Sequence, residues 1–518
     1  MDRSWAVVSS ESRFDVSALD KETPVYWIAH DDPLRPLSLE IFMRDYYEPR
    51  LLPRLLARGK EAFGPVRNLA ELNRVQPEVR IESIQQGPSP DEVRVDVSAS
   101  GKIDISQRNG KTTTGVYDLR LFRNGQLVGQ WPTPLDGSGT QADLANWRTN
   151  TLIVRHDQAK SVHRFVVPLA SGNKGQAVTF KAYAFNEDRV KSETDTVSYS
   201  LPADIASRTP RAYVITVGVN TYQNPHRELQ YAVKDATSLA TALKEIKGYE
   251  VVTVSLLSDR GQPGGGGAVD QATKANIRAV LELLSGKSEA GRDRLKQMTD
   301  VNVSKLTKVT PDDLVILAFS GHGHTEQDGR FYILPSDSGT NDTITAAELP
   351  NLISSEELSE WLREADAGQM VMILDACHAA GATASGEGEF KPGPMGDRGL
   401  GQLAYDKGML ILAATQASDV ALESDKLGQG LLTYALVHDG LDQRKAAHDG
   451  VITIEQWLQY GERRVPELYQ DVRDGKLALA KKGEIITAKE LRNTANQAQT
   501  PELFDFHKNK SNVVLRER

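Results

Sequence analysis

The chain has 518 residues, of which 39% are hydrophobic and 25% are charged, and its formal net charge is −9. These values predict a globular chain of two or three domains, and they disfavour a general nucleic-acid binder because no basic excess exists to neutralise phosphates. The single cysteine excludes a disulfide within the chain and fits a reducing compartment. The sequence shows neither an apolar signal core nor a run approaching 18 apolar residues, so we expect a cytoplasmic protein that does not enter a membrane.

Residues 1–75 predict a short strand followed by a helical segment. Apolar residues recur at helical spacing from Leu37 to Lys60, although Pro49 and Pro53 interrupt the pattern. We interpret this segment as a helix that packs within the protein, with a helix that docks a partner protein as the alternative.

Residues 76–203 change to short strands of alternating apolar and polar residues. Examples are Val79–Ile84 and Val93–Val97, and the pair Asn124-Gly125 marks a tight hairpin. This pattern predicts an all-β immunoglobulin-like sandwich. Since nothing in it looks catalytic, we expect a positioning or interaction module. A regulatory protein partner would bind through this sandwich or through the N-terminal segment.

Residues 210–445 alternate strands with helices, after a linker that ends at Pro210. Arg211–Asn220 predicts the first strand and Leu229–Leu243 the first helix. A glycine-rich loop at Ser258–Asp270 lacks the Gly-Lys-Ser/Thr of a phosphate-binding loop, which disfavours a nucleotide site. The whole region predicts an α/β domain with a mostly parallel sheet and helices on both faces.

Two buried strands of this domain end in chemically reactive residues. Leu314–Phe319 leads to His322 and Gly323, and Val371–Leu374 leads to Cys377. Parallel strands deliver the residues at their ends to the carboxyl edge of the sheet, where open α/β folds bind ligands. A neighbouring imidazole raises the thiolate fraction of a cysteine, and the backbone N–H groups of Gly323 and Cys377 are candidates to stabilise an oxyanion. A lone buried cysteine is more often a small core residue, but its pairing with a histidine favours a nucleophile.

These motifs resemble those of the caspase/metacaspase superfamily, in particular its bacterial caspase-family branch. The resemblance rests on Phe319–Gly323 (FSGHG) and Asp375–Gly381 (DACHAAG), with the histidine roughly 50 residues upstream of the cysteine. It extends over Pro210 to Leu441. It implies a caspase-like fold and a cysteine endopeptidase with His322 and Cys377 as a catalytic dyad that acts on a protein substrate.

The resemblance also implies a preference for basic residues. Caspases that cleave after aspartate carry a neutral glutamine two residues before the cysteine, whereas this chain has Asp375, which would attract arginine or lysine. Metacaspases add a second acid from the first helix, which corresponds to Asp235, although Ala232 replaces the cysteine of their pattern. Glu423 lies where the family places another substrate loop. The alternatives are a solvated acid at Asp235 or Glu423 and an acid at Asp375 that only orients its loop.

Residues 382–407 are rich in glycine and contain two prolines, which predicts an exposed, flexible loop. In the superfamily, cleavage in this region separates a large and a small subunit, so Lys391 and Arg398 are candidate self-cleavage positions. Residues 446–518 predict a C-terminal helical extension, with helical spacing from Ile454 to Val465.

We expect no cofactor, because no cluster of histidine, cysteine and acidic residues has the spacing of a metal site. Calcium activation, which occurs in many metacaspases, is an alternative in which Asp337 would take part. Three other functions remain: a catalytically silent caspase-fold scaffold, a protease with another substrate preference, and another thiol enzyme such as an acyl transferase. Family association implies regulated proteolysis, with bacterial stress or antiviral defence as its settings.

Overall fold

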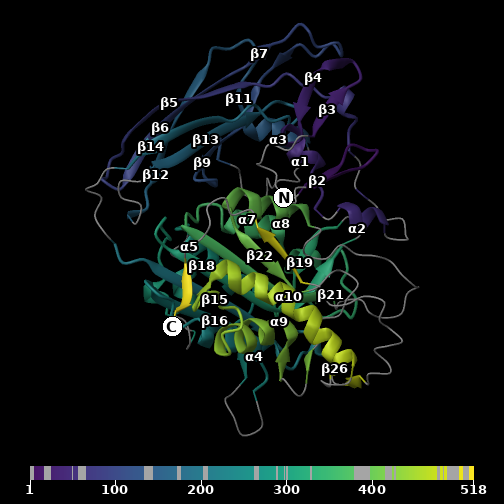
Figure 1. Cartoon of the computed structure of the whole chain (residues 1–518), viewed down its shortest axis with the longest axis vertical. Helices are drawn as coiled ribbons and strands as arrows, with labels where there is room; N and C mark the ends of the chain where they lie inside the picture. The colour runs from purple at the N-terminus through teal and green to yellow at the C-terminus, as the bar shows by residue number, and fades with distance from the viewer. Residues whose placement is uncertain are drawn as a thin grey trace. The chain divides into compact units, whose positions relative to one another are not determined.

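The computed structural model describes residues 5–16, 25–49, 51–56, 63, 66–133, 144–171, 177–201, 208–261, 268–287, 290–296, 298, 302–326, 329–378, 397–414, 423–424, 428–474, 479–481, 484–486, 501–505 and 513–517 (Figure 1). They form two compact units. The first is built mainly from residues 1–208 and the second mainly from residues 209–518.

The first unit opens with two small hairpins and short helices instead of one long helix. Pro49 explains part of this outcome, because proline disfavours helical backbone in the residue before it. Pro53 is tolerated inside a short helix because it lies in the first turn, where backbone N–H groups have no helical acceptor. The elements are β1 (Ala6–Val8), β2 (Phe14–Val16), β3 (Tyr26–Ala29), β4 (Asp32–Ser38), η1 (Leu39–Phe42), α1 (Met43–Tyr46), α2 (Leu51–Leu56) and η2 (Leu69–Glu71).

Two antiparallel sheets follow in the first unit and bury a common apolar cluster. The cluster includes Val93, Val95 and Val97 of one sheet and Phe180 and Ala182 of the other. One sheet has the order β12-β6-β5, and the other has the order β10-β9-β13-β14 with β11 beside β9. An immunoglobulin-like topology stays a prediction. The elements are β5 (Glu78–Gln86), β6 (Glu92–Ser100), β7 (Lys102–Ile103), β8 (Thr113–Thr114), β9 (Val116–Arg123), β10 (Gln126–Trp131), α3 (Leu144–Thr151), β11 (Leu152–Val154), β12 (Ser161–Pro168), β13 (Ala177–Phe185) and β14 (Asp195–Ser200).

The tight hairpin predicted from Asn124-Gly125 is confirmed between β9 and β10. Arg123 pairs with Gln126, and both turn residues have positive φ, 49° for Asn124 and 86° for Gly125. This is the backbone shape in which two-residue hairpin turns favour Asn-Gly.

The second unit is organised around a mixed sheet with the order β17-β16-β15-β18-β21-β22-β28. The five central strands, β16, β15, β18, β21 and β22, run parallel to one another, as predicted. In contrast, β17 and β28 pair antiparallel at the edges, and β19 pairs antiparallel with the end of β18. The strands are β15 (Arg211–Val219), β16 (Glu250–Asp259), β17 (Val269–Asp270), β18 (Leu314–Thr325), β19 (Phe331–Ile333), β20 (Ile353–Ser354), β21 (Gln369–His378), β22 (Leu410–Ala413) and β28 (Glu502–Asp505).

Helices cover both faces of this sheet, as the sequence predicts (Figure 1). Alternate residues of β15 face opposite sides: Ile215 and Val217 contact one apolar cluster, and Ala212 and Val214 contact the other. The first cluster includes residues of α5 (Lys274–Leu284), α7 (Ser355–Trp361) and α8 (Arg398–Lys407), and the second includes residues of α4 (Ala232–Ala242), α9 (Leu431–Tyr434), η8 (Ala435–Asp442) and α10 (Ile454–Arg473). The remaining elements are η4 (Pro225–Arg227), α6 (Ala290–Leu295), η5 (Val303–Lys305), η6 (Leu349–Asn351), β23 (Glu423–Ser424), β24 (Gln429–Gly430), β25 (Val451–Thr453), β26 (Leu479–Lys481), β27 (Glu484–Ile486) and β29 (Val514–Glu517).

Two predictions about the C-terminal half need correction. The expected loop 382–407 ends in a helix, since residues 398–407 form α8, and Asp397 accepts the backbone N–H groups of Gly399 and Leu400 at its start. Its glycines concealed the helical spacing of Leu400, Leu403 and Ala404, which pack against the sheet. The expected helical extension 446–518 contains α10, but it also supplies β28, which extends the central sheet.

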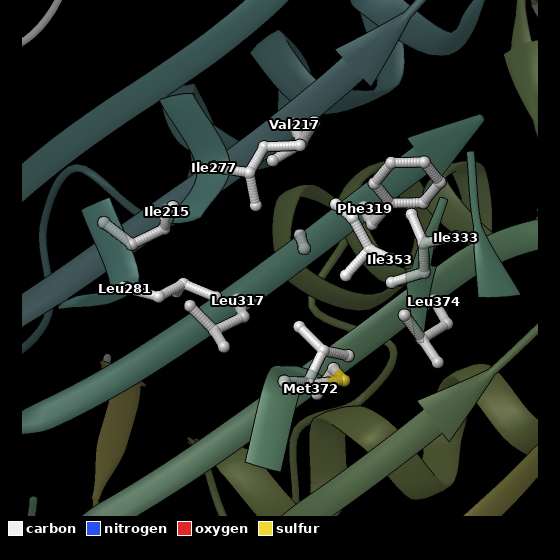
Figure 2. Close-up of a pocket in the computed structure, with 12 residues that line it drawn as sticks. Ile215, Val217, Ile277, Leu281, Leu317, Phe319, Ile333, Ile353, Met372 and Leu374 are labelled. Atoms are coloured by element: carbon white, nitrogen blue, oxygen red, sulfur yellow. The ribbon is translucent and has the colours of Figure 1, made fainter. Parts of the chain in front are cut away.

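A small apolar cavity of about 40 Å³ lies on the face of the sheet that α5 and α7 cover. Side chains from three neighbouring strands line it, and Figure 2 shows Ile215, Leu317 and Met372 around it. The cavity therefore belongs to the hydrophobic core beneath the strands that carry the site. In the described part of the chain, no helix is long and apolar enough to cross a membrane.

Candidate active site

The two reactive residues predicted from the sequence lie opposite one another. β18 and β21 run parallel, and their register pairs His322 with Cys377 and Gly323 with His378. Neighbouring strands lie about 4.8 Å apart, so the backbones of the histidine and the cysteine are lateral neighbours at the carboxyl end of the sheet. This edge is where parallel α/β sheets bind their ligands.

The imidazole of His322 is buried, with 4% of the residue exposed, and it is held in a defined orientation. Its Nε2 lies 2.8 Å from the carbonyl oxygen of Arg227. Because a carbonyl oxygen only accepts hydrogen bonds, this contact assigns the proton of the neutral ring to Nε2 and the lone pair to Nδ1. The ring orientation therefore leaves Nδ1 as the nitrogen that can take up a proton.

Tyr222 supports the same histidine from a second side. Its ring lies 5.1 Å from the imidazole, centroid to centroid, and its hydroxyl oxygen accepts the backbone N–H of His322 at 2.9 Å. A Cβ atom on Gly321 would lie 2.8 Å from this hydroxyl, which is closer than real side chains approach. Gly321 thus provides space for Tyr222.

Two carboxylates meet beside the strand that carries the cysteine. Asp375 of β21 is 7% exposed, and Asp235 in the first turn of α4 is 3% exposed. The backbone N–H of Gly430 donates to Asp235 at 3.0 Å, and the hydroxyl of Thr433 donates to Asp375 at 3.2 Å. A Cβ atom on Gly430 would lie 2.9 Å from Asp375 Oδ2 and 3.1 Å from Asp235 Oδ2. The two acids predicted to share a pocket therefore lie on either side of Gly430.

The environment of Asp375 favours its protonated form. Burial raises the pKa of its carboxyl to about 6, although the hydroxyl and the backbone N–H of Thr433 act in the opposite direction. A cationic side chain placed beside this carboxyl would lower its pKa again.

Comparison with known proteins identifies the domain that carries this geometry. The model of the Peptidase_C14 caspase-domain family matches residues 211–504. The chain belongs to this caspase-domain family. Caspase-1 from Spodoptera frugiperda has 13% sequence identity and a TM-score of 0.30, covering 58% of this chain and 90% of that chain. The structure of pro-Sf-caspase-1 has 11% identity and a TM-score of 0.31, covering 58% of this chain and 89% of that one. No curated protein matches the chain.

The caspase domain places the other predicted residues at different distances from this centre. The backbone of Glu423 pairs with Gly430 across β23 and β24, so it lies beside the acidic pair. Arg398 is half-buried and begins α8, whereas Lys391 lies outside the described residues. Asp337 accepts the backbone N–H of Lys274 at the start of α5. Among the described residues, no group of three or more histidine, cysteine or acidic side chains is arranged to hold a metal ion.

Sequence reasoning missed several groups that shape this caspase-domain site. The acceptor for His322 is the backbone carbonyl of Arg227. Because every residue has such a carbonyl, the sequence does not indicate which one contacts the histidine. The partners of Gly430 and Thr433, Asp235 and Asp375, are distant in sequence. Tyr222 follows the first strand, and only the fold shows that it contacts His322.

Proposed function

We propose that this protein is a cysteine endopeptidase that cleaves peptide bonds after arginine or lysine. The observation that carries the proposal is the register that sets His322 opposite Cys377 on neighbouring parallel strands. The caspase-domain fold is that of a cysteine protease family and implies protein substrates. A cytoplasmic location and a role in bacterial defence remain predictions.

The reaction follows from the assigned protonation of the imidazole. Nδ1 of His322 takes the thiol proton, and the thiolate of Cys377 attacks the carbonyl carbon of the scissile bond. The carbonyl of Arg227 accepts the Nε2–H and stabilises the imidazolium. Backbone N–H groups of Gly323 and Cys377 are proposed to hold the oxyanion. His322 then protonates the leaving amine, and a water molecule hydrolyses the thioester and restores the thiol.

The acidic pair supports the basic specificity. A guanidinium or ammonium group from the substrate would find two buried carboxylates, Asp235 and Asp375, held by backbone and hydroxyl donors. A substrate aspartate would add a third negative charge and be repelled. The backbone position of Glu423 is compatible with a further acid at the same pocket.

Self-processing in residues 382–407 is part of the proposal, and the helical position of Arg398 disfavours that candidate. Arg398 begins α8, so cleavage there requires that the helix unwinds into the extended form that proteases bind. We therefore favour Lys391 as the cleaved residue. Intact masses of the wild type, Cys377→Ala and Lys391→Ala after long incubation would show this, and an unchanged wild-type mass would contradict it.

A positional peptide library tests the main proposal. Wild type and Cys377→Ala would be assayed with and without calcium, which also decides whether the ion activates the enzyme. We expect cleavage after arginine and lysine by the wild type only. Efficient cleavage after aspartate would overturn the specificity, and a wild type that cleaves no member under either condition would favour a silent scaffold.

A further inference from the structure

The hydrogen-bond acceptor of His322 does not belong to the sheet. It is the backbone of Arg227, the last residue of the three-residue turn η4, which lies between β15 and α4. A turn this short has little rigidity of its own. The orientation of the imidazole therefore depends on whatever fixes η4.

The side chain of Arg227 attaches this turn to a neighbouring loop. It is 3% exposed, Nη1 donates to the hydroxyl of Ser338 at 3.3 Å, and Nη2 donates to the carbonyl of Asn341. Its Nε is buried without a hydrogen-bond partner, and in the described part of the chain no carboxylate lies at ion-pair distance from the guanidinium. Burial lowers the pKa of Arg227, while Glu348 and Asp342 favour its charged form from farther away.

A buried arginine without a paired acid is rarely chosen for stability alone. Charged side chains are almost never fully buried unless they are paired, because desolvation costs more than neutral hydrogen bonds return. An apolar residue of similar volume would fill the same space without that cost. The placement of Arg227 thus indicates a task other than packing.

The loop that receives Arg227 is itself tied in place. The carboxylate of Glu348 accepts the backbone N–H groups of Asn341 at 3.2 Å and Thr345 at 3.4 Å. The carbonyl of Asn341 accepts a second donor, the side-chain amide of Asn224, at 2.8 Å, and Asn224 is the residue that caps η4. Side chains from both ends of the turn therefore donate to the same carbonyl.

We propose that Arg227 is a positioning residue for the catalytic histidine. Its guanidinium, locked on Ser338 and Asn341, holds the turn whose carbonyl accepts the Nε2–H of His322. This inference rests on the proposed function of His322 as the base. A change of the side chain keeps the carbonyl in the chain but releases it from its brace, so the imidazole loses its orientation.

The position of Arg227 predicts a specific kinetic signature. The acids that would bind the substrate belong to α4 and β21 and are held by Gly430 and Thr433, so KM should change little. A misoriented base slows the chemical step, and displacements of about 1 Å can cost roughly 100-fold in rate. We expect Arg227→Met to lower kcat by about 10- to 100-fold. The kcat of Arg227→Lys should lie between those of the wild type and Arg227→Met, because lysine keeps the positive charge but lacks the planar guanidinium with its several donors.

A second measurement uses the only cysteine of the chain and needs no peptide substrate. The rate of alkylation by iodoacetamide reports the thiolate fraction of Cys377 as a function of pH. In Arg227→Met the midpoint should move to higher pH, toward that of a free thiol, because the imidazole no longer assists ionisation. In the part of the chain that the structure describes, Tyr222 and the backbone of Arg227 contact His322, and Asp342 and Glu348 act on the guanidinium from farther away.

Two further variants separate positioning from folding. Arg211→Met removes an arginine that pairs with Glu250 and begins β15, whose other end pairs with β18 just before His322. This control should keep the wild-type kcat and alkylation profile. Asn224→Ala loosens the same carbonyl of Asn341 from the other side and should lower kcat in the same direction as Arg227→Met.

The outcomes distinguish this inference from the proposed function. Wild-type kcat and alkylation profile in Arg227→Met would overturn the positioning role while leaving the peptidase intact. If the wild type cleaves no peptide but the alkylation midpoint still moves in Arg227→Met, the positioning role stands and the peptidase proposal fails. Circular dichroism shows whether Arg227→Met folds. If it does not fold, the test uses Asn224→Ala, and a wild-type kcat in that variant would overturn the positioning role of Arg227.

Discussion

Two buried acids, Asp188 in the first unit and Asp375 in the second, lie in opposite environments. In the first unit, Asp188 is surrounded by donors: burial alone would raise its pKa, but the N–H of Asn73 and the side chains of Arg67 and Lys111 lower it to about 2. In the second unit, burial raises the pKa of Asp375 to about 6, and its donors in the described residues are the neutral groups of Thr433. The comparison teaches that burial alone does not fix the pKa of an acid: cationic partners keep Asp188 charged, whereas the neutral donors of Asp375 only partly offset the cost of its burial.

The largest expected effect comes from Asp375→Asn. Loss of the charge should reduce kcat/KM for arginine peptides by about 100- to 1,000-fold, or about 3–4 kcal/mol of transition-state binding. Stability at pH 8 should stay equal or rise, because a buried charge is removed. Peptide kinetics measure the change in kcat/KM, and thermal unfolding at pH 8 measures the change in stability. Equal cleavage of arginine peptides by variant and wild type would break the comparison.

The pH dependence of stability should differ between the units. The folded pKa of Asp375, about 6, lies above its ordinary value of 3.8, so its contribution is fully present below about pH 4 and is lost as pH rises through 6. This loss amounts to at most about 3 kcal/mol in the second unit. Asp188 has a lowered pKa, so its contribution is present above about pH 4 and is lost only as pH falls toward 2.

Amide hydrogen exchange at pH 5 and pH 8, corrected for the intrinsic rates, would follow each unit separately. The second unit should lose protection at the higher pH, and the first should not. Burial also raises the pKa of Asp397 to about 6, so Asp375→Asn should remove only part of the effect. Equal pH responses in both units would contradict the contrast.

A smaller effect is expected from Asp188→Asn in the first unit. The change removes the charge that Arg67, Arg148 and Lys111 share, but these partners are partly exposed and regain water. We expect a loss of about 1–2 kcal/mol in the free energy of unfolding. The kcat of arginine-peptide cleavage should not change. A loss of activity without a loss of stability would assign Asp188 a role that the comparison denies.

The smallest effect is expected from an apolar substitution, which changes the packing of the second unit without changing its charge. Val217→Ile adds a methyl group beside the cavity of about 40 Å³ and should stabilise the second unit by at most about 1 kcal/mol. Its matched control is Val214→Ile, on the opposite face of the same strand, where tight packing should make the extra methyl group destabilising. Denaturant unfolding measures both, and neither should alter the pH response. Equal changes of stability in both variants would mean that the cavity has no room.

Much of this architecture could be predicted from local patterns. Apolar strands that end in His322 and Cys377 indicate a shared sheet edge, and a parallel register then makes the two residues neighbours. The Asn124-Gly125 hairpin follows from turn chemistry alone. These features need only the side chains of a few consecutive residues.

The remainder depends on contacts between distant segments. The role of the Arg227 carbonyl requires that a turn approach His322, and a backbone atom leaves no trace in the residue pattern. Helix α8 gains stability from the sheet and from Asp397, and its glycines are poor helix formers in isolation. Strand β28 joins the sheet from far along the chain, beyond the reach of any local pattern.

Asp397 fixes the start of α8 to the rest of the second unit. Its carboxylate accepts the backbone N–H of Phe331 in β19 and the hydroxyl of Ser355 in α7, as well as the first N–H groups of α8. The next strand, β22, pairs with β21 on one side and β28 on the other. A single cut between residues 379 and 396 would therefore yield two polypeptides that remain one particle, joined by a shared sheet and a buried anchor at the new junction.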